Sequence, residues 1–177
     1  MRCAVAVLVM LCAAVLVTPT AAALTAADHQ VIFVVRHAER AATSDPNASK
    51  RMMADDPPLT AAGQARAARL ATMLASADIK RIYTTEFQRT RQTAAPLADK
   101  LKITPVMAAA KDPAPLVRQL QQGTGNALVV GHSNTIPDLL KKLGVKDTVT
   151  IADDQYDDLF IVIRRVGESP TLVRLKY

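Results

Sequence analysis

Three short runs of apolar or β-branched residues predict buried strands in this chain. The clearest is residues 31–35, with five consecutive apolar positions, and residues 127–130 and 82–85 are shorter examples. Continuous runs of this length are typical of strands that are covered on both faces. In an open α/β sheet, ligands bind where such strands end. The residues directly after these runs are therefore the first candidates for chemistry.

Segments with helical composition alternate with these strands. They are predicted over residues 61–77, 86–100, 112–122 and 136–143. Thr60 is the expected N-cap of the first helix, and Arg66 and Arg69 are expected to face solvent. The apolar face of this helix is predicted to contain Leu70, Met73 and Leu74. Residues 41–59, which precede it, are polar and rich in proline and aspartate, and their length predicts a binding loop.

The end of the chain predicts a β-hairpin. Residues 159–163 and 171–175 are apolar-rich runs on either side of a turn at residues 167–170, which favours an antiparallel pair at a sheet edge. The strands before it alternate with helices and should pair in parallel. The expected fold class is therefore α/β: a three-layer α/β/α sandwich with a mostly parallel central sheet and a C-terminal antiparallel hairpin.

Two of the three histidines follow directly after predicted strands. Arg36-His37 comes after the first strand, and Gly131-His132 comes after residues 127–130. One such histidine is more often an ordinary loop residue than a catalyst, but the pair matches what phosphoryl transfer to nitrogen requires. A neutral imidazole can attack phosphorus, while arginine and a second histidine neutralise the phosphoryl oxygens. The pattern predicts a phosphoryl-transfer site at these strand ends.

A further arginine is expected at the start of the helix over residues 86–100. Arg89 would lie in its first turn, where the helix N-terminus carries partial positive charge and free N–H groups. A guanidinium there can bind a phosphate through two hydrogen bonds, which a lysine cannot do. Arg91, two residues later, is expected on the solvent face. Arg89 is therefore a candidate phosphate-binding residue.

These segments together resemble the histidine phosphatase superfamily, in its phosphoglycerate mutase-like branch. The chain has counterparts of the family's nucleophile motif, of its segment with a second phosphate-binding arginine and of its second-histidine motif. In this order they are Arg36-His37-Ala38-Glu39, residues 85–94 and Gly131-His132-Ser133. Each motif is short, but their order and spacing are specific, and the resemblance extends over nearly the whole chain after residue 23.

Two positions depart from the family pattern. Ala38 stands where glycine is commoner, and Ser133 stands where the acid phosphatase and phytase branch has an aspartate after the second histidine. The second departure disfavours the acid phosphatase and phytase branch. The resemblance therefore implies the phosphoglycerate mutase-like fold.

The resemblance also implies a two-step hydrolysis of phosphomonoesters that needs neither a metal nor a cofactor. His37 would attack phosphorus as a neutral ring, while the N–H of its other nitrogen would donate a hydrogen bond to a fixed acceptor such as a backbone carbonyl. Water would then hydrolyse the phosphohistidine. Arg36, Arg89 and His132 would bind the phosphoryl oxygens.

The leaving oxygen needs a proton from a general acid. Mutase-like relatives place a glutamate in the loop after the third strand, where this chain has Asp112. Glu39, beside the nucleophile, is the second candidate, unless it pairs with Arg40 or orients another arginine. Asp112 is slightly favoured. Arg40 and Ser133 are further candidate substrate-binding residues.

The first 23 residues have the features of a secretory signal peptide. Arg2 precedes an apolar core at residues 4–17, and three alanines at residues 21–23 end the segment. The core is shorter than the about 20 residues that a transmembrane helix needs, although an uncleaved anchor is the alternative. We therefore expect a secreted or periplasmic protein, a single domain over residues 24–177 and no stable membrane association after cleavage.

The composition limits the classes of ligand and partner that the chain is expected to bind. Both cysteines, Cys3 and Cys12, fall in the segment that export would remove, which excludes disulfides and a cysteine metal site in the remainder. The formal net charge of +6 suits an anionic substrate or simply solubility. The sequence has no tryptophan, three tyrosines and three phenylalanines, too few aromatic residues to suggest nucleic-acid binding. A small phosphorylated molecule is the expected partner.

Three function classes remain open. An exported phosphatase is favoured. A phosphomutase of the same fold would need a larger surface over the site to retain the phosphoryl group, and a non-catalytic phosphate-binding protein would keep the arginines without turnover. The sequence leaves the oligomeric state and the substrate open, whether a phosphorylated sugar, another small phosphomonoester or a phosphohistidine protein.

Overall fold

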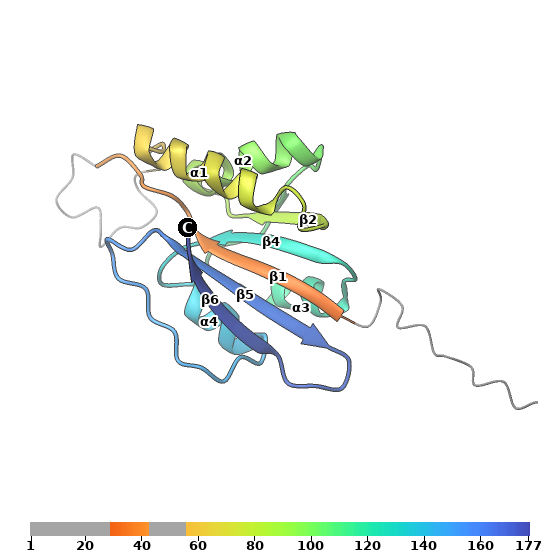
Figure 1. Ribbon diagram of the computed structural model, residues 1–177. Coiled ribbons are helices and arrows are strands. Elements are labelled where there is room, and N and C mark those ends of the chain that lie inside the picture. Colours follow the sequence, from red (N-terminus) through yellow and green to blue (C-terminus); the bar gives the residue numbers. More distant parts are fainter. Residues whose placement is uncertain (1–28, 43–55) are drawn as a thin grey trace, which may run out of the picture.

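A computed structural model describes residues 29–42 and 56–177 of the chain (Figure 1). The predicted signal peptide, residues 1–23, and most of the predicted binding loop, residues 41–59, lie outside these described residues. Within the described ranges, no helix is long and apolar enough to cross a membrane.

A six-stranded sheet with the order β3-β2-β4-β1-β5-β6 forms the centre of the protein. The strands are β1 (His29–Arg36), β2 (Ile79–Thr84), β3 (Val106–Met107), β4 (Asn126–Gly131), β5 (Asp158–Arg165) and β6 (Thr171–Lys176). The first four pair in parallel, whereas β5 is antiparallel to both β1 and β6. The sheet is mostly parallel and ends in an antiparallel hairpin, as the sequence predicted.

Two helices cover each face of this sheet, as Figure 1 shows. The helices are α1 (Ala61–Leu74), α2 (Gln88–Leu101), α3 (Ala114–Gln122) and α4 (Ile136–Lys142). Because side chains alternate along a strand, Val34 and Val129 pack with α3 and α4, while Val35 and Val130 pack with α1 and α2. Each face has its own apolar core, which confirms the three-layer arrangement and explains the continuous apolar runs in β1 and β4.

The buried stripe of α1 differs in part from the predicted one. Its buried residues are Gly63, Ala67, Leu70, Ala71 and Leu74. The small residues among them recur at intervals of four and let the helix approach closely, so the stripe follows them and leaves Met73 45% exposed. Arg66 lies beside this stripe and pairs with Glu39. The expectations that Met73 is buried and that Arg66 faces solvent are therefore wrong.

Strand β3 begins directly after Pro105. β3 consists of two residues, Val106 and Met107, which pair with Tyr83 and Thr84 of β2. Pro105 has no N–H to donate to a strand ladder, which accounts for this start. β3 forms one edge of the sheet.

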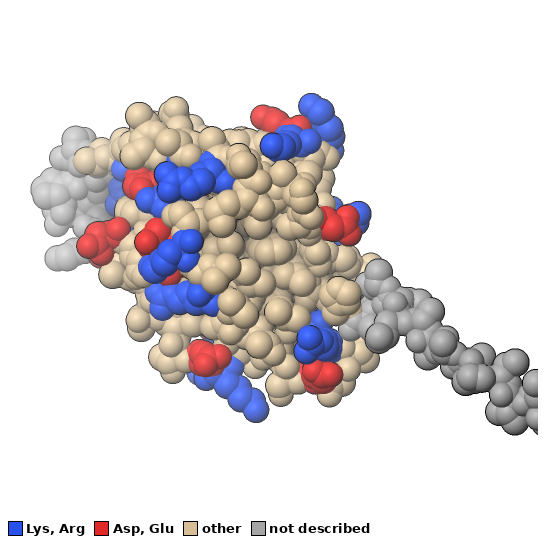
Figure 2. Space-filling view, viewed as in Figure 1, with Lys and Arg blue, Asp and Glu red and all other residues tan. Residues whose placement is uncertain are grey.

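Charged residues at the opposite edge are paired. The carboxylate of Asp158 is 1% exposed and accepts hydrogen bonds from Arg174 at 2.7 and 2.9 Å. Lys176 Nζ lies 2.9 Å from Asp158 Oδ1 and 2.8 Å from Asp157 Oδ1. On the face shown in Figure 2, basic side chains accordingly lie next to acidic ones. These pairs hold β6 against β5, because a buried carboxylate is costly without a cationic partner.

The start of α1 lies against the backbone that follows β1. The Thr60 hydroxyl accepts a hydrogen bond from Gly63 N at 3.1 Å, which confirms the predicted N-cap. Thr60 N–H donates to the Glu39 carbonyl at 2.9 Å. A Cβ added at Gly63 would lie only 2.2 Å from this same carbonyl oxygen. Gly63 is thus required for close contact between α1 and the segment that carries His37.

We expect Gly63→Ala to destabilise the protein by about 1–3 kcal/mol, the usual cost of overpacking, although alanine is the better helix former. Urea unfolding would measure the change in the free energy of unfolding. Gln64→Ala, at an exposed position of the same helix, is the matched control and should change it by no more than about 0.5 kcal/mol. An alanine variant as stable as the parent would contradict the close contact.

Candidate active site

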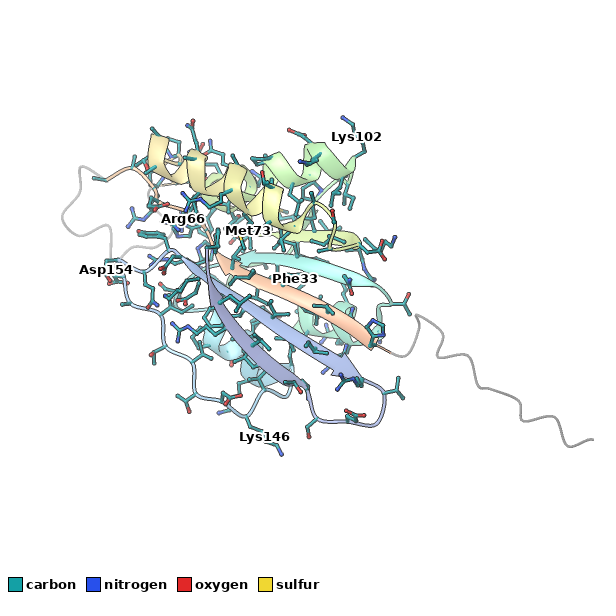
Figure 3. The ribbon with its side chains drawn as sticks, in the orientation of Figure 1. Phe33, Arg66, Met73, Lys102, Lys146 and Asp154 are labelled. Atoms are coloured by element: carbon teal, nitrogen blue, oxygen red, sulfur yellow. The ribbon has the colours of Figure 1, made fainter. Side chains whose placement is uncertain are left out.

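The carboxyl ends of β1 and β4 bring the two motif histidines together. Arg36 is paired with Gly131 in the parallel register, and His37 N–H donates to the Gly131 carbonyl at 2.9 Å. His37 and His132 each follow the last residue of their strand, and their ring centroids are 5.4 Å apart. This end of the sheet lies near Arg66 and Asp154, both labelled in Figure 3.

His37 is buried and oriented by its own backbone. Its Nδ1 donates to the carbonyl of Ala38 at 2.8 Å, which leaves the Nε2 lone pair for chemistry. Burial lowers the pKa of His37 to about 3; the hydrogen bond to the Ala38 carbonyl opposes this shift, and His132, Arg89 and Arg36 add to it. The ring is therefore neutral at physiological pH. This confirms the expected neutral imidazole donating to a backbone carbonyl.

His132 is 2% exposed and makes one side-chain hydrogen bond. Its Nε2 lies 3.0 Å from Thr85 Oγ1, while Nδ1 is buried without a partner. The edge of the Phe87 ring packs against it, with centroids 5.2 Å apart. Burial, followed by the charges of Arg89 and Arg36, lowers the pKa of His132 to about 3. His132 is thus also neutral.

Arg36 is held by the loop that precedes β5. Its Nη1 donates to three backbone carbonyls, those of Ala152, Asp153 and Gln155, at 2.9, 2.9 and 3.0 Å. The guanidinium lies 4.1 Å from the centroid of the Tyr156 ring. Its Nε is buried and has no partner. Burial lowers the pKa of Arg36, and the carbonyls and the ring compensate for the lost hydration of its charge.

Arg89 lies in the first turn of α2, as predicted, and is 4% exposed. Its guanidinium lies 4.1 Å from the centroid of the Phe87 ring, and its Nη1 is 3.4 Å from Asp56 Oδ1. The Asp56 carboxylate also accepts from the N–H of Gln88 at the start of α2. Nε of Arg89 is buried without a partner. Arg91, by contrast, is exposed, as expected.

The two candidate acids have different surroundings. Glu39 accepts from Arg66 Nε and Nη2 at 2.9 and 2.7 Å, and these bonds lower the pKa of its carboxyl group. Asp112 is exposed, and its Oδ1 accepts from the N–H of Ala114 at the start of α3. An ionised, paired carboxylate is a poor proton donor. The ion pair therefore favours a role for Glu39 in orienting Arg66. This role is one of the alternatives that the sequence left open.

The remaining two predicted substrate-binding residues lie beside the site. Arg40 is partly buried and pairs with Leu59 in an isolated β-bridge. Its charge is close enough to lower the pKa of both Arg36 and Arg89. Ser133 is partly buried in the turn between β4 and α4.

Several residues of the site were not identified from the sequence. Asp56 and Tyr156 lie in loops without periodic patterning, so no local feature of the sequence connects them with the arginines. Thr93 is different because it belongs to the 85–94 segment: its hydroxyl accepts from Ala38 N–H at 2.9 Å and donates to the Arg89 carbonyl at 2.7 Å. A conspicuous series of threonines in that segment was the available indication.

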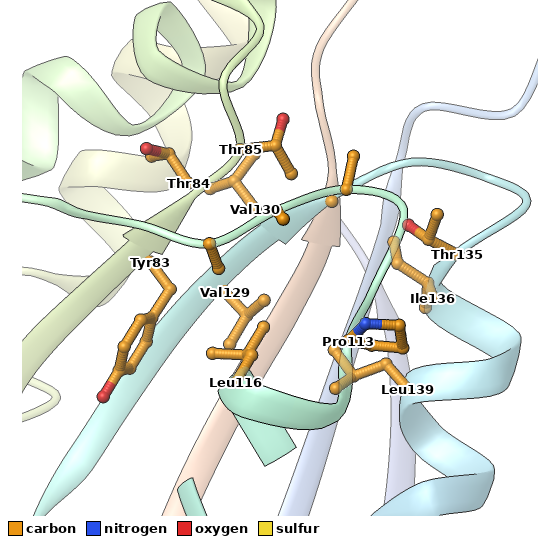
Figure 4. A pocket seen from close by; sticks show the side chains of 14 residues that line it. Tyr83, Thr84, Thr85, Pro113, Leu116, Val129, Val130, Thr135, Ile136 and Leu139 are labelled. Atoms are coloured by element: carbon orange, nitrogen blue, oxygen red, sulfur yellow. The ribbon is translucent and has the colours of Figure 1, made fainter. Parts of the chain in front are cut away.

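Two hollows lie on the side of the site formed by Thr85 and Phe87. One is a largely apolar cavity of about 30 Å³ between the sheet and helices α3 and α4 (Figure 4). Thr85 and Gly131 border it, but its size suits no more than about one water. The other, of about 330 Å³, opens beside Phe87 and is bordered by Lys111, Pro113 and Asn134. This second hollow has room for the body of a small substrate, and so does a larger one of about 400 Å³ beside Glu39, Arg66 and Tyr156.

The site combines an available nucleophile with unsatisfied nitrogens. Nε of Arg36, Nε of Arg89 and Nδ1 of His132 are three of the four buried side-chain polar atoms without a partner in the described part of the chain. Buried polar groups normally have partners, so these nitrogens are suited to an anion with several oxygens. No group of three or more metal-ligating side chains occurs in residues 29–42 and 56–177.

Comparisons with known proteins agree with this geometry. The model of the histidine phosphatase superfamily (branch 1) matches residues 32–111, the stretch with Arg36, His37 and Arg89. No curated protein sequence matches the chain significantly.

Several solved structures share the fold. The protein histidine phosphatase SixA in complex with tungstate is 20% identical, with a TM-score of 0.64, and the match covers 82% of this chain and 96% of SixA. A SixA protein of Agrobacterium tumefaciens is 19% identical (TM-score 0.60; 83% and 98% covered), and a mycobacterial glucosyl-3-phosphoglycerate phosphatase is 13% identical (TM-score 0.60; 84% and 98% covered). Residues 32–111 thus match the histidine phosphatase superfamily (branch 1), and the chain shares its fold with solved phosphatases such as SixA.

Proposed function

We propose that this protein is a phosphomonoesterase that works through a phosphohistidine at His37. The observation that carries the proposal is the arrangement around this ring. His37 is neutral, with Nδ1 bonded to a carbonyl and Nε2 available. Partnerless nitrogens of Arg36, Arg89 and His132 accompany it. A phosphoryl group supplies the oxygens that these nitrogens lack, next to a nucleophile in its reactive protonation state.

The reaction follows from these positions. Nε2 of His37 attacks phosphorus, the bond to the leaving oxygen breaks, and a general acid protonates that oxygen. Arg36 and Arg89 neutralise the charge on the remaining phosphoryl oxygens. Water then attacks the phosphohistidine, which releases inorganic phosphate and restores the neutral ring. No residue in this scheme requires a metal ion.

The substrate class is proposed to be small phosphorylated molecules. The hollow beside Phe87, about 330 Å³ in volume, has room for a small leaving group. Among the structural neighbours are a protein histidine phosphatase and a glucosyl-3-phosphoglycerate phosphatase. A first panel should therefore include sugar phosphates, phosphoglycerates and a phosphohistidine protein, with release of phosphate as the readout.

We further propose Asp112 as the general acid. Its neighbours Lys111 and Pro113 border the hollow beside Phe87, where a leaving group would lie. Glu39 is held as an anion by Arg66. Arg40 and Ser133 are proposed to contact the substrate from the edges of the site.

Export is the last part of the proposal. It is supported by the charge, the core length and the alanine ending of residues 1–23. The intact mass of the protein from the periplasm or the medium should correspond to a chain that begins near residue 24. A mature protein that still carries residues 1–23 would contradict the proposal.

His37→Ala should abolish nearly all activity, because loss of a nucleophile costs several orders of magnitude. Arg89→Ala should lower kcat about 100- to 1,000-fold, as expected for one electrostatic donor. Rapid quench with a labelled phosphomonoester should trap an acid-labile, base-stable adduct at His37. Activity should persist in EDTA.

Arg91→Ala is the matched control for Arg89→Ala, since Arg91 is exposed in the same helix turn. It should retain nearly full activity. Label at another residue, or loss of activity in EDTA, would exclude the phosphohistidine mechanism as stated. Binding of phosphate without any turnover would indicate the phosphate-binding alternative, and transfer of label to a second hydroxyl would indicate a mutase.

Asp112→Asn should reduce kcat most for substrates with poor leaving groups, because an alkoxide needs a proton and an activated aryl oxide does not. Glu39→Gln should lower activity equally for all leaving groups, and Arg66→Gln should do the same, since each breaks the same ion pair. Rates across a series of phenyl and alkyl phosphates would test this. If only Glu39→Gln showed a leaving-group dependence, Glu39 and not Asp112 would be the general acid.

A further inference from the structure

Only one of the two ring nitrogens of His132 has a hydrogen-bond partner. One ring nitrogen, Nε2, lies 3.0 Å from Thr85 Oγ1, and the other, Nδ1, is buried without a partner. Two buried threonines, Thr85 and Thr90, continue this contact away from the ring. The direction of the hydroxyl protons along this chain decides which nitrogen of His132 carries its proton.

That direction follows from the acceptors at the far end. Thr90 Oγ1 lies 2.8 Å from the Phe87 carbonyl and 3.2 Å from the Thr85 carbonyl. Carbonyl oxygens can only accept, and the contact with the Phe87 carbonyl is shorter than the 3.0 Å between the two threonine hydroxyls, so we assign the one hydroxyl proton of Thr90 to that carbonyl. The Thr90 oxygen in turn accepts from the backbone N–H of Thr85 at 3.1 Å.

The contact between the two hydroxyls is then determined. Thr85 Oγ1 and Thr90 Oγ1 are 3.0 Å apart, and one of them must donate. Because Thr90 has already donated its proton, Thr85 is the donor. The Thr85 oxygen retains only lone pairs, so His132 Nε2 must donate to it. A neutral His132 is therefore protonated at Nε2, and its Nδ1 carries a lone pair.

We propose that Thr85 and Thr90 are positioning residues that hold His132 as the Nε2–H tautomer, so that Nδ1 is the nitrogen that meets the phosphoryl group. This inference rests on the proposed phosphatase function, since it assigns the role of His132 in that site. Phosphoryl oxygens are acceptors, and a lone pair on Nδ1 cannot donate to them. Nδ1 must therefore take up a proton from water when a phosphoryl anion binds.

The charges around His132 are consistent with this proton uptake. Burial, together with the charges of Arg89 from α2 and Arg36 from β1, lowers the pKa of His132 to about 3. The neutral ring of His37 faces it from the end of β1. A bound dianion offsets the two guanidinium charges and gives the protonated ring a negatively charged neighbour, and both effects raise the pKa of His132. His132 can then become a donor at Nδ1 while Nε2 still donates to Thr85.

Nitrogen-15 spectra of histidine-labelled full chain, at neutral pH, test the tautomer without reference to catalysis. The signals of His132 are assigned by their loss in His132→Asn. The expected result is a protonated Nε2 and an unprotonated Nδ1. Addition of tungstate, as a phosphoryl stand-in, should protonate Nδ1. An Nδ1–H tautomer in the free protein, or an Nδ1 that stays unprotonated with bound tungstate, would overturn the inference.

Three variants separate positioning from a merely structural role. Thr85→Val removes the acceptor and should populate the Nδ1–H tautomer, with kcat lower by about 10- to 100-fold. Thr85→Ser keeps the hydroxyl and should preserve both the Nε2–H tautomer and kcat. Thr90→Val removes the acceptor of the Thr85 proton, so Thr85 can donate to Nε2, and the Nδ1–H tautomer should again appear. Unchanged spectra in both valine variants would overturn the proposal.

Thr72→Val is the matched control, because Thr72 is exposed on α1 and its hydroxyl donates to the Ala68 carbonyl of the same helix. It should alter neither the spectra nor kcat. The two proposals fail separately. A chain with the Nε2–H tautomer but no hydrolysis would refute the phosphatase function and leave the tautomer assignment standing, whereas active enzyme with the other tautomer would refute only the role of Thr85 and Thr90.

Discussion

The parallel pairing of β1 with β4 is the interaction on which the site depends. It places Arg36 beside Gly131, and the His37 N–H extends the same ladder by one bond to the Gly131 carbonyl. His37 and His132, 95 residues apart in the sequence, thereby become neighbours. A slip of one residue would displace one histidine by about 3.3 Å and turn the strand's apolar side chains to the wrong face. The two apolar cores therefore determine the register, and the register determines the distance between the rings.

Burial of two arginines next to two neutral histidines gives the site its electrostatic character. Arg36 is compensated by three carbonyls and the Tyr156 ring, and Arg89 by Asp56 and the Phe87 ring. In both arginines Nε is left without a partner. Unsatisfied buried groups cost stability, and an arrangement of this kind is expected where the missing partner is a ligand. Donors that are already fixed in place need no reorganisation when the anion arrives.

Burial, to which the same charges add, keeps both histidines unprotonated. For His37 this preserves the lone pair that a nucleophile requires, with the tautomer fixed by the Ala38 carbonyl. For His132 the tautomer is fixed from the opposite nitrogen, through Thr85. The two rings thus have similar pKa values, but each is held through a different ring nitrogen, Nδ1 in His37 and Nε2 in His132. One histidine therefore has Nε2 available and the other Nδ1, and this difference is compatible with different roles in one phosphoryl-transfer site.

The sequence alone determined the layers of the fold, because alternating apolar strands and amphipathic helices are encoded by local periodicity. It also placed His37, His132 and Arg89 at strand and helix ends, where neighbouring parallel strands converge. Only the tertiary structure decided the partners of these residues: Arg66 for Glu39, Asp56 for Arg89, Tyr156 and the 152–155 carbonyls for Arg36, and Thr85 for His132. Most of these contacts join residues far apart in the chain, several of them through loops without periodicity. Their hydrogen bonds depend on distances and directions that exist only once the sheet and helices are packed.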